Sequence, residues 1–256
     1  MKTPQVKILI WDVENAPALG YFYDYYREGN IIEVVNPPFL LSAAYKWLGD
    51  PKVHCLALPD FAGYRRDRGD DKRLVEALAA VLDSADIIVA HNGDRFDITM
   101  TNTRLVTHAL PPLSPKKTVD TLKIARARFK FLSNRLDDLG NVLGVGRKLP
   151  HTGKKLWLAC MAGDPDAWKL MRKYNIQDVL LLEKVYLKLR PFAANHPNIN
   201  YFTRQPLACP SCGSTHSQRR GATYTATKET PRLQCMSCYK WFSGKPEALA
   251  TKVYTK

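Results

Sequence analysis

The chain has 256 residues, of which 45% are hydrophobic, enough for one medium-sized core and a small additional module. No apolar run approaches the roughly 18–20 residues that span a bilayer, and the apolar stretch near the N-terminus ends at Trp11, too early for the core of a secretion signal. We therefore expect a cytoplasmic protein without a membrane partner. The formal net charge of +14 favours a polyanionic partner, above all nucleic acid, over a merely basic soluble surface.

The hydrophobic pattern predicts an α/β fold, a mixed sheet flanked by helices. Short apolar runs indicate strands over residues 6–11, 40–48, 53–58, 86–90 and 118–122. Apolar residues at helical spacing indicate helices over residues 70–84, 97–109 and 166–189. A strand hairpin followed by strand–helix alternation is typical of a mixed sheet. The periodicity stops over residues 196–206, where we expect a linker.

Four acidic residues lie where such a sheet could gather them. Asp12 and Glu14 end the first strand and share one of its faces, because side chains alternate along a strand. Asp97 starts the helix after a later strand, and Asp178 lies one helical turn from Tyr174. Singly, each residue has an ordinary explanation, such as a helix cap or a solvated acid. Together they predict a site in which divalent cations neutralise the carboxylates and phosphodiester bonds are cleaved.

The order of these motifs resembles the DEDD superfamily of 3′–5′ exonucleases. The similarity is greatest to the DnaQ-like, tyrosine-bearing (DEDDy) branch related to the proofreading domain of family-B DNA polymerases, in its stand-alone phage and bacterial form with a C-terminal zinc ribbon. Lys173 stands where the sister branch carries histidine. The resemblance covers roughly residues 6–190 and rests on three motifs. They are Asp12-x-Glu14, Asn92-x-x-x-Phe96-Asp97 and Tyr174-x-x-x-Asp178.

The resemblance implies a ribonuclease H-like fold and a hydrolase that releases nucleoside 5′-monophosphates. Asp12, Glu14 and Asp178 would hold one Mg²⁺ or Mn²⁺, and Asp12 would bridge to a second ion that Asp97 reaches directly or through water. Tyr174 would orient the nucleophile by hydrogen bonding, because a phenol with a pKa near 10 is a poor base at neutral pH.

The implied substrate is a single-stranded 3′ end, contacted by Asn92, Arg95 and Phe96. Single-stranded DNA is the preferred substrate, in a bacterial or phage-infected cell with replication or repair proteins as partners. A 3′–5′ exoribonuclease of the same superfamily is the nearest alternative, because two-metal chemistry does not need the 2′-hydroxyl. A nucleic-acid-binding or recruitment protein without turnover is disfavoured by the complete set of carboxylates. An endonuclease would cut circular single strands, which an exonuclease leaves whole.

Two Cys-x-x-Cys pairs separated by 22 residues predict a Cys₄ zinc ribbon with one structural Zn²⁺. The ligands would be Cys209, Cys212, Cys235 and Cys238. The metal would supply most of the folding energy of so small a module. Disulfide pairing is the less favoured alternative in a reducing compartment. Cys55 and Cys160 lie in apolar surroundings and are expected to be core thiols.

The predicted domains are an exonuclease domain (1–195), a linker (196–206), the zinc ribbon (207–245) and a basic tail (246–256). Residues 206–256 carry eight basic and two acidic side chains, a balance of +6 that favours nucleic acid over protein as the partner of the ribbon. An aromatic run at residues 21–26 is expected to pack rather than to line a substrate groove. Arg147 and Lys148, with Lys154 and Lys155, flank a loop that either steers phosphates or is simply solvated.

Overall fold

A computed structural model describes residues 6–23, 31–150, 152–205 and 207–248. These residues form two compact units. We call Lys7–Tyr186 the sheet unit, and the residues from Leu187 onward together with Val6 the cysteine unit. The boundary falls within the long helix α6 (Pro165–Leu189). The domain limits expected from the sequence stay a prediction.

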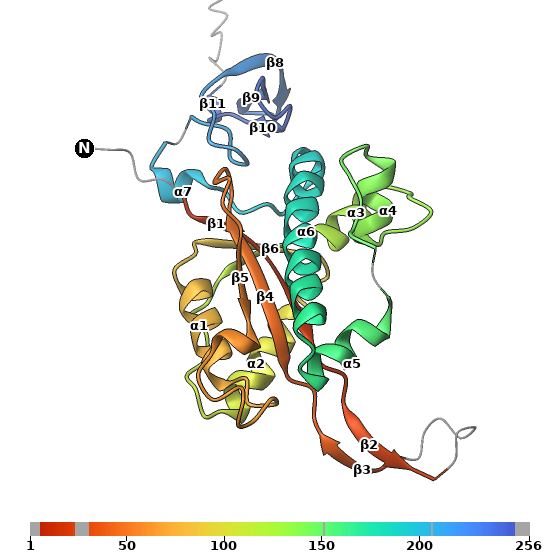
Figure 1. Ribbon diagram of the computed structural model, residues 1–256. Coiled ribbons are helices and arrows are strands. Elements are labelled where there is room, and N and C mark those ends of the chain that lie inside the picture. The colour runs from red at the N-terminus through yellow and green to blue at the C-terminus, as the bar shows by residue number, and fades with distance from the viewer. Residues whose placement is uncertain (1–5, 24–30, 151, 206, 249–256) are drawn as a thin grey trace, which may run out of the picture. The chain divides into compact units, whose positions relative to one another are not determined.

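The sheet unit contains the predicted mixed sheet (Figure 1). In the described part of the unit, the strand order is β5-β4-β1-β6-β7. The central strand β1 pairs antiparallel with β4 and parallel with β6; β5 extends the antiparallel side and β7 the parallel side. The strands are β1 (Ile8–Asn15), β4 (Leu40–Trp47), β5 (His54–Ala57), β6 (Ile87–Ala90) and β7 (Lys117–Asp120). β1 is longer than expected because β4 pairs with it as far as Asn15, so the acidic residues lie within the sheet.

Helices cover both faces of this sheet. α1 (Lys72–Asp83) and α2 (Asp97–Thr107) lie on one face, and α6 lies on the other (Figure 1). α1 is preceded by the short helix η1 (Leu58–Asp60). Three further helices follow β7: α3 (Thr121–Arg128), α4 (Leu136–Val142) and α5 (Lys154–Ala162). The outcome confirms the predicted fold class, a mixed α/β sheet flanked by helices.

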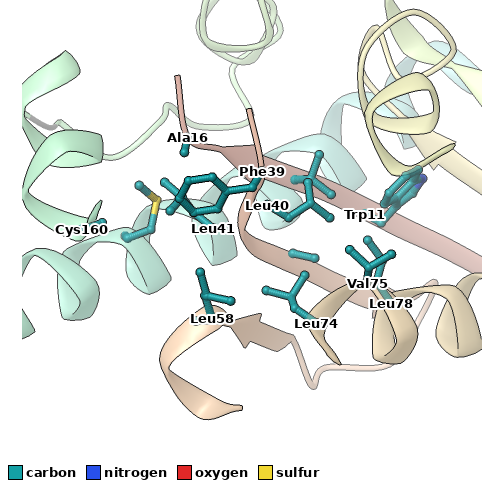
Figure 2. Close-up of a cluster of buried hydrophobic side chains, with 14 of the residues drawn as sticks. Trp11, Ala16, Phe39, Leu40, Leu41, Leu58, Leu74, Val75, Leu78 and Cys160 are labelled. Carbon is teal, nitrogen blue, oxygen red and sulfur yellow. The ribbon is translucent and has the colours of Figure 1, made fainter. Parts of the chain in front are cut away.

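The alternation of side chains along β1 separates its core from its polar face. Leu9, Trp11 and Val13 are buried in the core that includes residues of α1. Figure 2 shows Trp11 with Val75 and Leu78 of that helix. Trp11 is fully buried, and burial of one such large side chain stabilises the fold by about 3 kcal/mol. Cys160 belongs to the same core and Cys55 is partly buried, in line with their expected role. The even-numbered positions of β1 therefore point to the opposite face, where α6 lies.

A two-stranded hairpin interrupts the chain between β1 and β4. It consists of β2 (Leu19–Phe22) and β3 (Ile31–Asn36), which pair antiparallel. The side chains of Tyr21, Phe22 and Tyr23 are exposed by 63%, 59% and 92%. The expectation that this aromatic run packs is wrong for these three residues, because nothing in the described part of the chain covers them on this hairpin. The rest of the run, residues 24–26, lies outside the described residues.

The cysteine unit is built around a small antiparallel sheet. Strand β9 (Lys228–Cys235) pairs with β8 (Ser217–Tyr224), β10 (Trp241–Ser243) and β11 (Glu247–Ala248). The β8–β9 hairpin connects the two Cys-x-x-Cys pairs. Two short helices, η2 (Arg190–Phe192) and α7 (Asn200–Thr203), precede it, and α7 falls in the segment expected to be a linker. Residues 249–256 of the expected basic tail lie outside the described residues. In the described ranges, no helix combines the length and apolarity needed to span a membrane.

Candidate active site

Three of the four predicted carboxylates converge between β1 and α6. Asp12 and Glu14 lie opposite Ala44 and Ser42 of β4. Asp12 accepts a hydrogen bond from Asn175 of α6, so this face of β1 is the one that α6 covers. Asp178 extends from α6 and is 1% exposed. One carboxylate oxygen from each of Asp12, Glu14 and Asp178 can be chosen so that all three lie within 4.8 Å of one another. A strand and a helix distant in sequence thus place three acids at one point.

Asp97 lies beside this group rather than in it. It is the first residue of α2, is 2% exposed, and accepts a hydrogen bond of 3.0 Å from the backbone N–H of Val13. Phe96, not Asp97, is the N-cap of the helix. The turn before α2 needs glycine at position 93, because a Cβ atom there would lie 2.3 Å from Cβ of Ala90. This close turn brings Asp97 next to Val13, which lies between Asp12 and Glu14 on β1.

Burial and mutual repulsion make these acids unusually weak. Burial, reinforced by Asp97 and Glu14, raises the pKa of Asp12 well above its ordinary value. Burial and then the charge of Asp178 raise the pKa of Glu14 to about 8. Burial raises the pKa of Asp97 to about 7, although the hydrogen bond from Val13 works against it. A cation at this position would offset the repulsion, so the electrostatics of the site favour cation binding.

Lys148 places one positive charge among the carboxylates. Its Nζ donates to Oδ2 of Asp178 at 2.6 Å and to the hydroxyl of Tyr174 at 3.0 Å. Burial alone would lower the pKa of Lys148, but Asp178 outweighs it and the pKa is raised. Burial raises the pKa of Tyr174, so its phenol stays protonated at neutral pH. Neither expectation for the basic loop anticipated this contact, because a lysine in a loop gives no sequence sign of its ion-pair partner.

Two more side chains that the sequence did not single out hold the carboxylates in place. Asn175 donates from Nδ2 to Oδ2 of Asp12 at 2.8 Å, and its Oδ1 accepts from the hydroxyl of Ser42 at 3.0 Å. Trp157 donates from Nε1 to Oε2 of Glu14 at 3.1 Å. Asn175 precedes Asp178 by three residues on one helix, a spacing that places both on one face and could have identified it. The sequence offers no such sign for Trp157.

The three residues expected to contact substrate lie in and around the turn between β6 and α2. Asn92 has a left-handed φ of 64°, and its backbone N–H donates to Oδ1 of Asp120 at 2.9 Å. Asp120 also caps α3, because its side chain accepts hydrogen bonds from backbone N–H groups of the first helical turn. Arg95 and Phe96 are exposed, Phe96 by 46%. An aromatic ring and a cation are therefore accessible on the turn that carries Asp97.

The four cysteines of the two Cys-x-x-Cys pairs also converge. Their Sγ atoms lie within 4.8 Å of one another, with 3.7 Å from Cys209 to Cys238 and 3.6 Å from Cys212 to Cys235. These distances exclude disulfides in this structure, since a bonded pair is separated by about 2.05 Å. Sulfurs placed tetrahedrally about 2.3 Å from a zinc ion would be about 3.8 Å apart. The cysteine cluster could therefore bind a metal ion.

The two clusters fit different metals. Carboxylate oxygens are hard ligands, which suit Mg²⁺ or Mn²⁺, whereas four thiolates suit Zn²⁺. Hydrogen bonding, chiefly from the thiol of Cys212, lowers the pKa of Cys209 to about 5, while the pKa values of Cys212 and Cys238 are raised. Without a metal ion, Cys209 therefore carries the thiolate and its neighbours keep their protons. The chemistry of the donors thus separates one acidic site from one sulfur site.

Comparisons with known proteins agree with this fold. The profile of the RNase_H superfamily matches residues 59–190, just over half of the chain, a range that includes Asp97, Tyr174 and Asp178. A DNA polymerase III PolC-type of Ureaplasma parvum serovar 3 is 42% identical over 67 residues, which is 26% of this chain and 4% of that protein.

Among solved structures, the family B DNA polymerase of the archaeon Pyrobaculum calidifontis superimposes with a TM-score of 0.53 at 16% identity. The match covers 88% of this chain and 32% of the polymerase, and at this identity it shows the fold alone. The chain thus spans only a small part of each polymerase. The profile match, which covers most of the sheet unit, establishes that the chain belongs to the RNase_H superfamily.

Proposed function

We propose that this protein is a metal-dependent 3′–5′ exonuclease that shortens single-stranded DNA and releases nucleoside 5′-monophosphates. The observation that carries the proposal is the convergence of Asp12, Glu14 and Asp178 within 4.8 Å on an RNase H-like sheet. The local similarity to a DNA polymerase III PolC-type supports DNA as the substrate. The direction of cleavage rests on the resemblance of the three acidic motifs to the tyrosine-bearing DEDD exonucleases.

The carboxylates would hold two Mg²⁺ or Mn²⁺ ions. Asp12, Glu14 and Asp178 would bind the first ion, and Asp12 with Asp97 the second, because Asp97 lies beside the group of three. When bound, such ions lower the pKa of a water nucleophile and neutralise the charge that develops on the phosphate and the leaving oxygen. Asn175 and Trp157 keep Asp12 and Glu14 oriented through the hydrogen bonds described above.

Tyr174 would act by hydrogen bonding rather than as a base. Its raised pKa keeps the phenol protonated, so that the O–H can position the nucleophile. Lys148 donates to the phenol oxygen at 3.0 Å and fixes the ring at the edge of the site. Asn92, Arg95 and Phe96 would contact the terminal nucleotides, with Phe96 as the stacking surface. Loss of the phenol hydroxyl should therefore slow the reaction without abolishing it.

The cysteine unit would be a zinc ribbon with one structural Zn²⁺ held by its four thiolates. A unit of this size has little apolar core, so that metal binding would supply much of its folding free energy. The nearest alternative activity is 3′–5′ exoribonuclease cleavage by the same residues, because none of the site residues needs to recognise the 2′-hydroxyl.

The direct test is a cleavage assay with 5′-labelled DNA and RNA oligonucleotides in Mg²⁺ or Mn²⁺. We expect the wild type to produce a ladder that shortens from the 3′ end of DNA. Asp12→Ala and Asp178→Ala should abolish the ladder, whereas Tyr174→Phe should only slow it. Asp166→Ala is the matched control, because Asp166 lies on the same helix as Asp178 but its side chain is 86% exposed. It should cleave like the wild type.

Each alternative has its own outcome in this assay. A ladder on RNA alone identifies an exoribonuclease. Cleavage of circular single-stranded DNA identifies an endonuclease. Binding without any metal-dependent cleavage identifies a recruitment protein and contradicts the proposed function, as does full activity of Asp178→Ala.

A further inference from the structure

The cysteine unit contains a pocket that the proposed chemistry does not use. It has a volume of about 800 Å³ and lies between the segment that follows Tyr186 and the second Cys-x-x-Cys pair with β10. This is within the size range of small-molecule and nucleotide sites. The side chains that matter for its chemistry are Lys188, Arg190, Phe192, Tyr239, Lys240 and Trp241.

These side chains combine exposed aromatic rings with positive charge. Phe192, Tyr239 and Trp241 are exposed by 54%, 65% and 45% although they are large and hydrophobic. Lys188 is exposed as well, and the described residues that line the pocket include no acidic side chain. Aromatic rings on which bases stack, next to cations that attract phosphates, are the two elements of single-strand binding. The lining therefore matches a nucleotide in both shape and charge.

The backbone at Tyr239 strengthens this interpretation. Tyr239 follows the second Cys-x-x-Cys pair with a left-handed φ of 63°, and its N–H donates to the carbonyl of Cys235 at 2.9 Å. The equivalent residue after the first pair is Gly213, with a φ of 76° and the same kind of bond, at 2.8 Å, to Cys209. Glycine adopts this conformation without strain, whereas tyrosine pays about 1 kcal/mol. Strained backbone positions cluster at ligand-binding sites, so a tyrosine at this position supports a binding role for its side chain.

Contacts with neighbouring residues position Trp241 and join the two sides of the pocket. The guanidinium of Arg232 lies 5.2 Å from the ring centroid of Trp241, within the range of a cation–π interaction. Lys240 donates from Nζ to the carbonyl of Ala193, and its own carbonyl accepts from the N–H of Cys235 at 2.9 Å. These contacts position the ring of Trp241 and join both sides of the pocket within the cysteine unit before a ligand binds. Prior ordering lowers the entropic cost of binding.

We propose that this pocket is a second nucleotide-binding site, which holds one nucleotide of a single-stranded nucleic acid away from the hydrolytic carboxylates. The base stacks on Tyr239 and Trp241, and the adjoining phosphate lies near Lys188. The proposal rests on the proposed function, since the strand held here is the strand that is shortened. It assigns to the cysteine unit a role in substrate retention in addition to its own folding.

The test measures binding of a 5′-fluorescein-labelled dT₁₂ strand by anisotropy, in the full-length chain carrying Asp12→Ala so that the strand is not degraded. Adding Tyr239→Gly should weaken binding about tenfold, since one stacked base contributes about 1–3 kcal/mol. Glycine relieves the strained backbone, so zinc content and thermal stability should be unchanged or higher. Tyr224→Ala is the matched control, because Tyr224 is 68% exposed in the same unit but does not line the pocket. It should bind normally.

Two further measurements separate this site from the active site. Lys188→Gln should reduce the slope of log K against log salt concentration by about 0.7, the value for one phosphate contact on a single strand, whereas Lys228→Gln in β9 should not. In the chain with Asp12 intact, Tyr239→Gly should leave hydrolysis of the p-nitrophenyl ester of thymidine 5′-monophosphate unchanged, because this substrate fills only the active site.

The outcomes are distinguishable. If Tyr239→Gly and Phe192→Ala both bind dT₁₂ as tightly as Tyr224→Ala does, the pocket is not a nucleotide-binding site. That result would favour a protein as the ligand of the pocket. If the wild type hydrolyses neither DNA nor the ester, the proposed function fails, while the comparison of dT₁₂ affinities still decides the role of the pocket. Loss of zinc in Tyr239→Gly would show a structural role for the tyrosine and contradict the proposal.

Discussion

Removal of the positive charge of Lys148 should destabilise the sheet unit until a metal ion replaces it. Lys148 forms a 2.6 Å ion pair with Asp178, whose side chain is 1% exposed, while that of the lysine is 32% exposed. Breaking a buried pair costs about 3–5 kcal/mol. Solvent screening of the partly exposed lysine reduces this figure. We therefore expect Lys148→Met, which keeps an unbranched side chain of similar length without the charge, to lower the free energy of unfolding by about 2 kcal/mol.

The assay is urea unfolding followed by tryptophan fluorescence, in buffer freed of divalent ions by a chelating resin. Lys154→Met is the matched control, because Lys154 is an exposed lysine at the start of α5 and should unfold like the wild type. Added Mg²⁺ should restore most of the lost stability in Lys148→Met, since an ion at the carboxylates supplies the missing charge. Equal unfolding midpoints for the two variants, or no extra gain from Mg²⁺ in Lys148→Met, would refute this account of the electrostatics.

Three more results are expected. Asn175→Ala should lower the free energy of unfolding by about 2 kcal/mol, because Asp12 and Ser42 lose a buried hydrogen-bond partner. It should also lower nuclease activity. An unfolding curve and a cleavage rate equal to those of the wild type would show that the contact is unimportant. Elemental analysis should find one zinc ion in the purified wild type and none in Cys212→Ser. A wild type without zinc would show that the cluster does not bind this metal. Burial lowers the pKa of His91 to about 4, so the unfolded chain binds the extra proton below pH 6.5. The contribution of His91 to stability should therefore fall by about 2 kcal/mol between pH 6.5 and 4, whereas the raised pKa values of Glu14 and Asp97 favour the folded state as the pH falls. The urea midpoint of His91→Asn, compared with that of the wild type at the same pH, should therefore rise as the pH falls over this range.

The fold was largely predictable because its signals are local and periodic. The apolar residues at odd positions of the first strand and the apolar row of α1 determine which face of the sheet packs against that helix. The acidic residues of β1 then necessarily share the other face. The aromatic run at residues 21–23 was misjudged because hydrophobicity alone does not reveal that a segment leaves the sheet as a hairpin.

The neighbours of the acidic site were less accessible from the sequence than the acids themselves. Lys148 and Trp157 reach Asp178 and Glu14 through contacts that depend on how separate segments pack. A single sequence carries no sign of such pairs. The spacing of Asn175 before Asp178 did carry one, since both lie on one helical face. Pattern therefore identified the charged residues, and packing determined which groups hold them.

Diffraction from crystals grown with Mn²⁺ tests most directly whether the carboxylates between β1 and α6 hold paired metal ions. We expect two anomalous-scattering peaks that share Asp12, one of them also bound by Glu14 and Asp178 and the other near Asp97. Manganese found only elsewhere in the protein, with Asp178 still paired to Lys148 alone, would contradict the account.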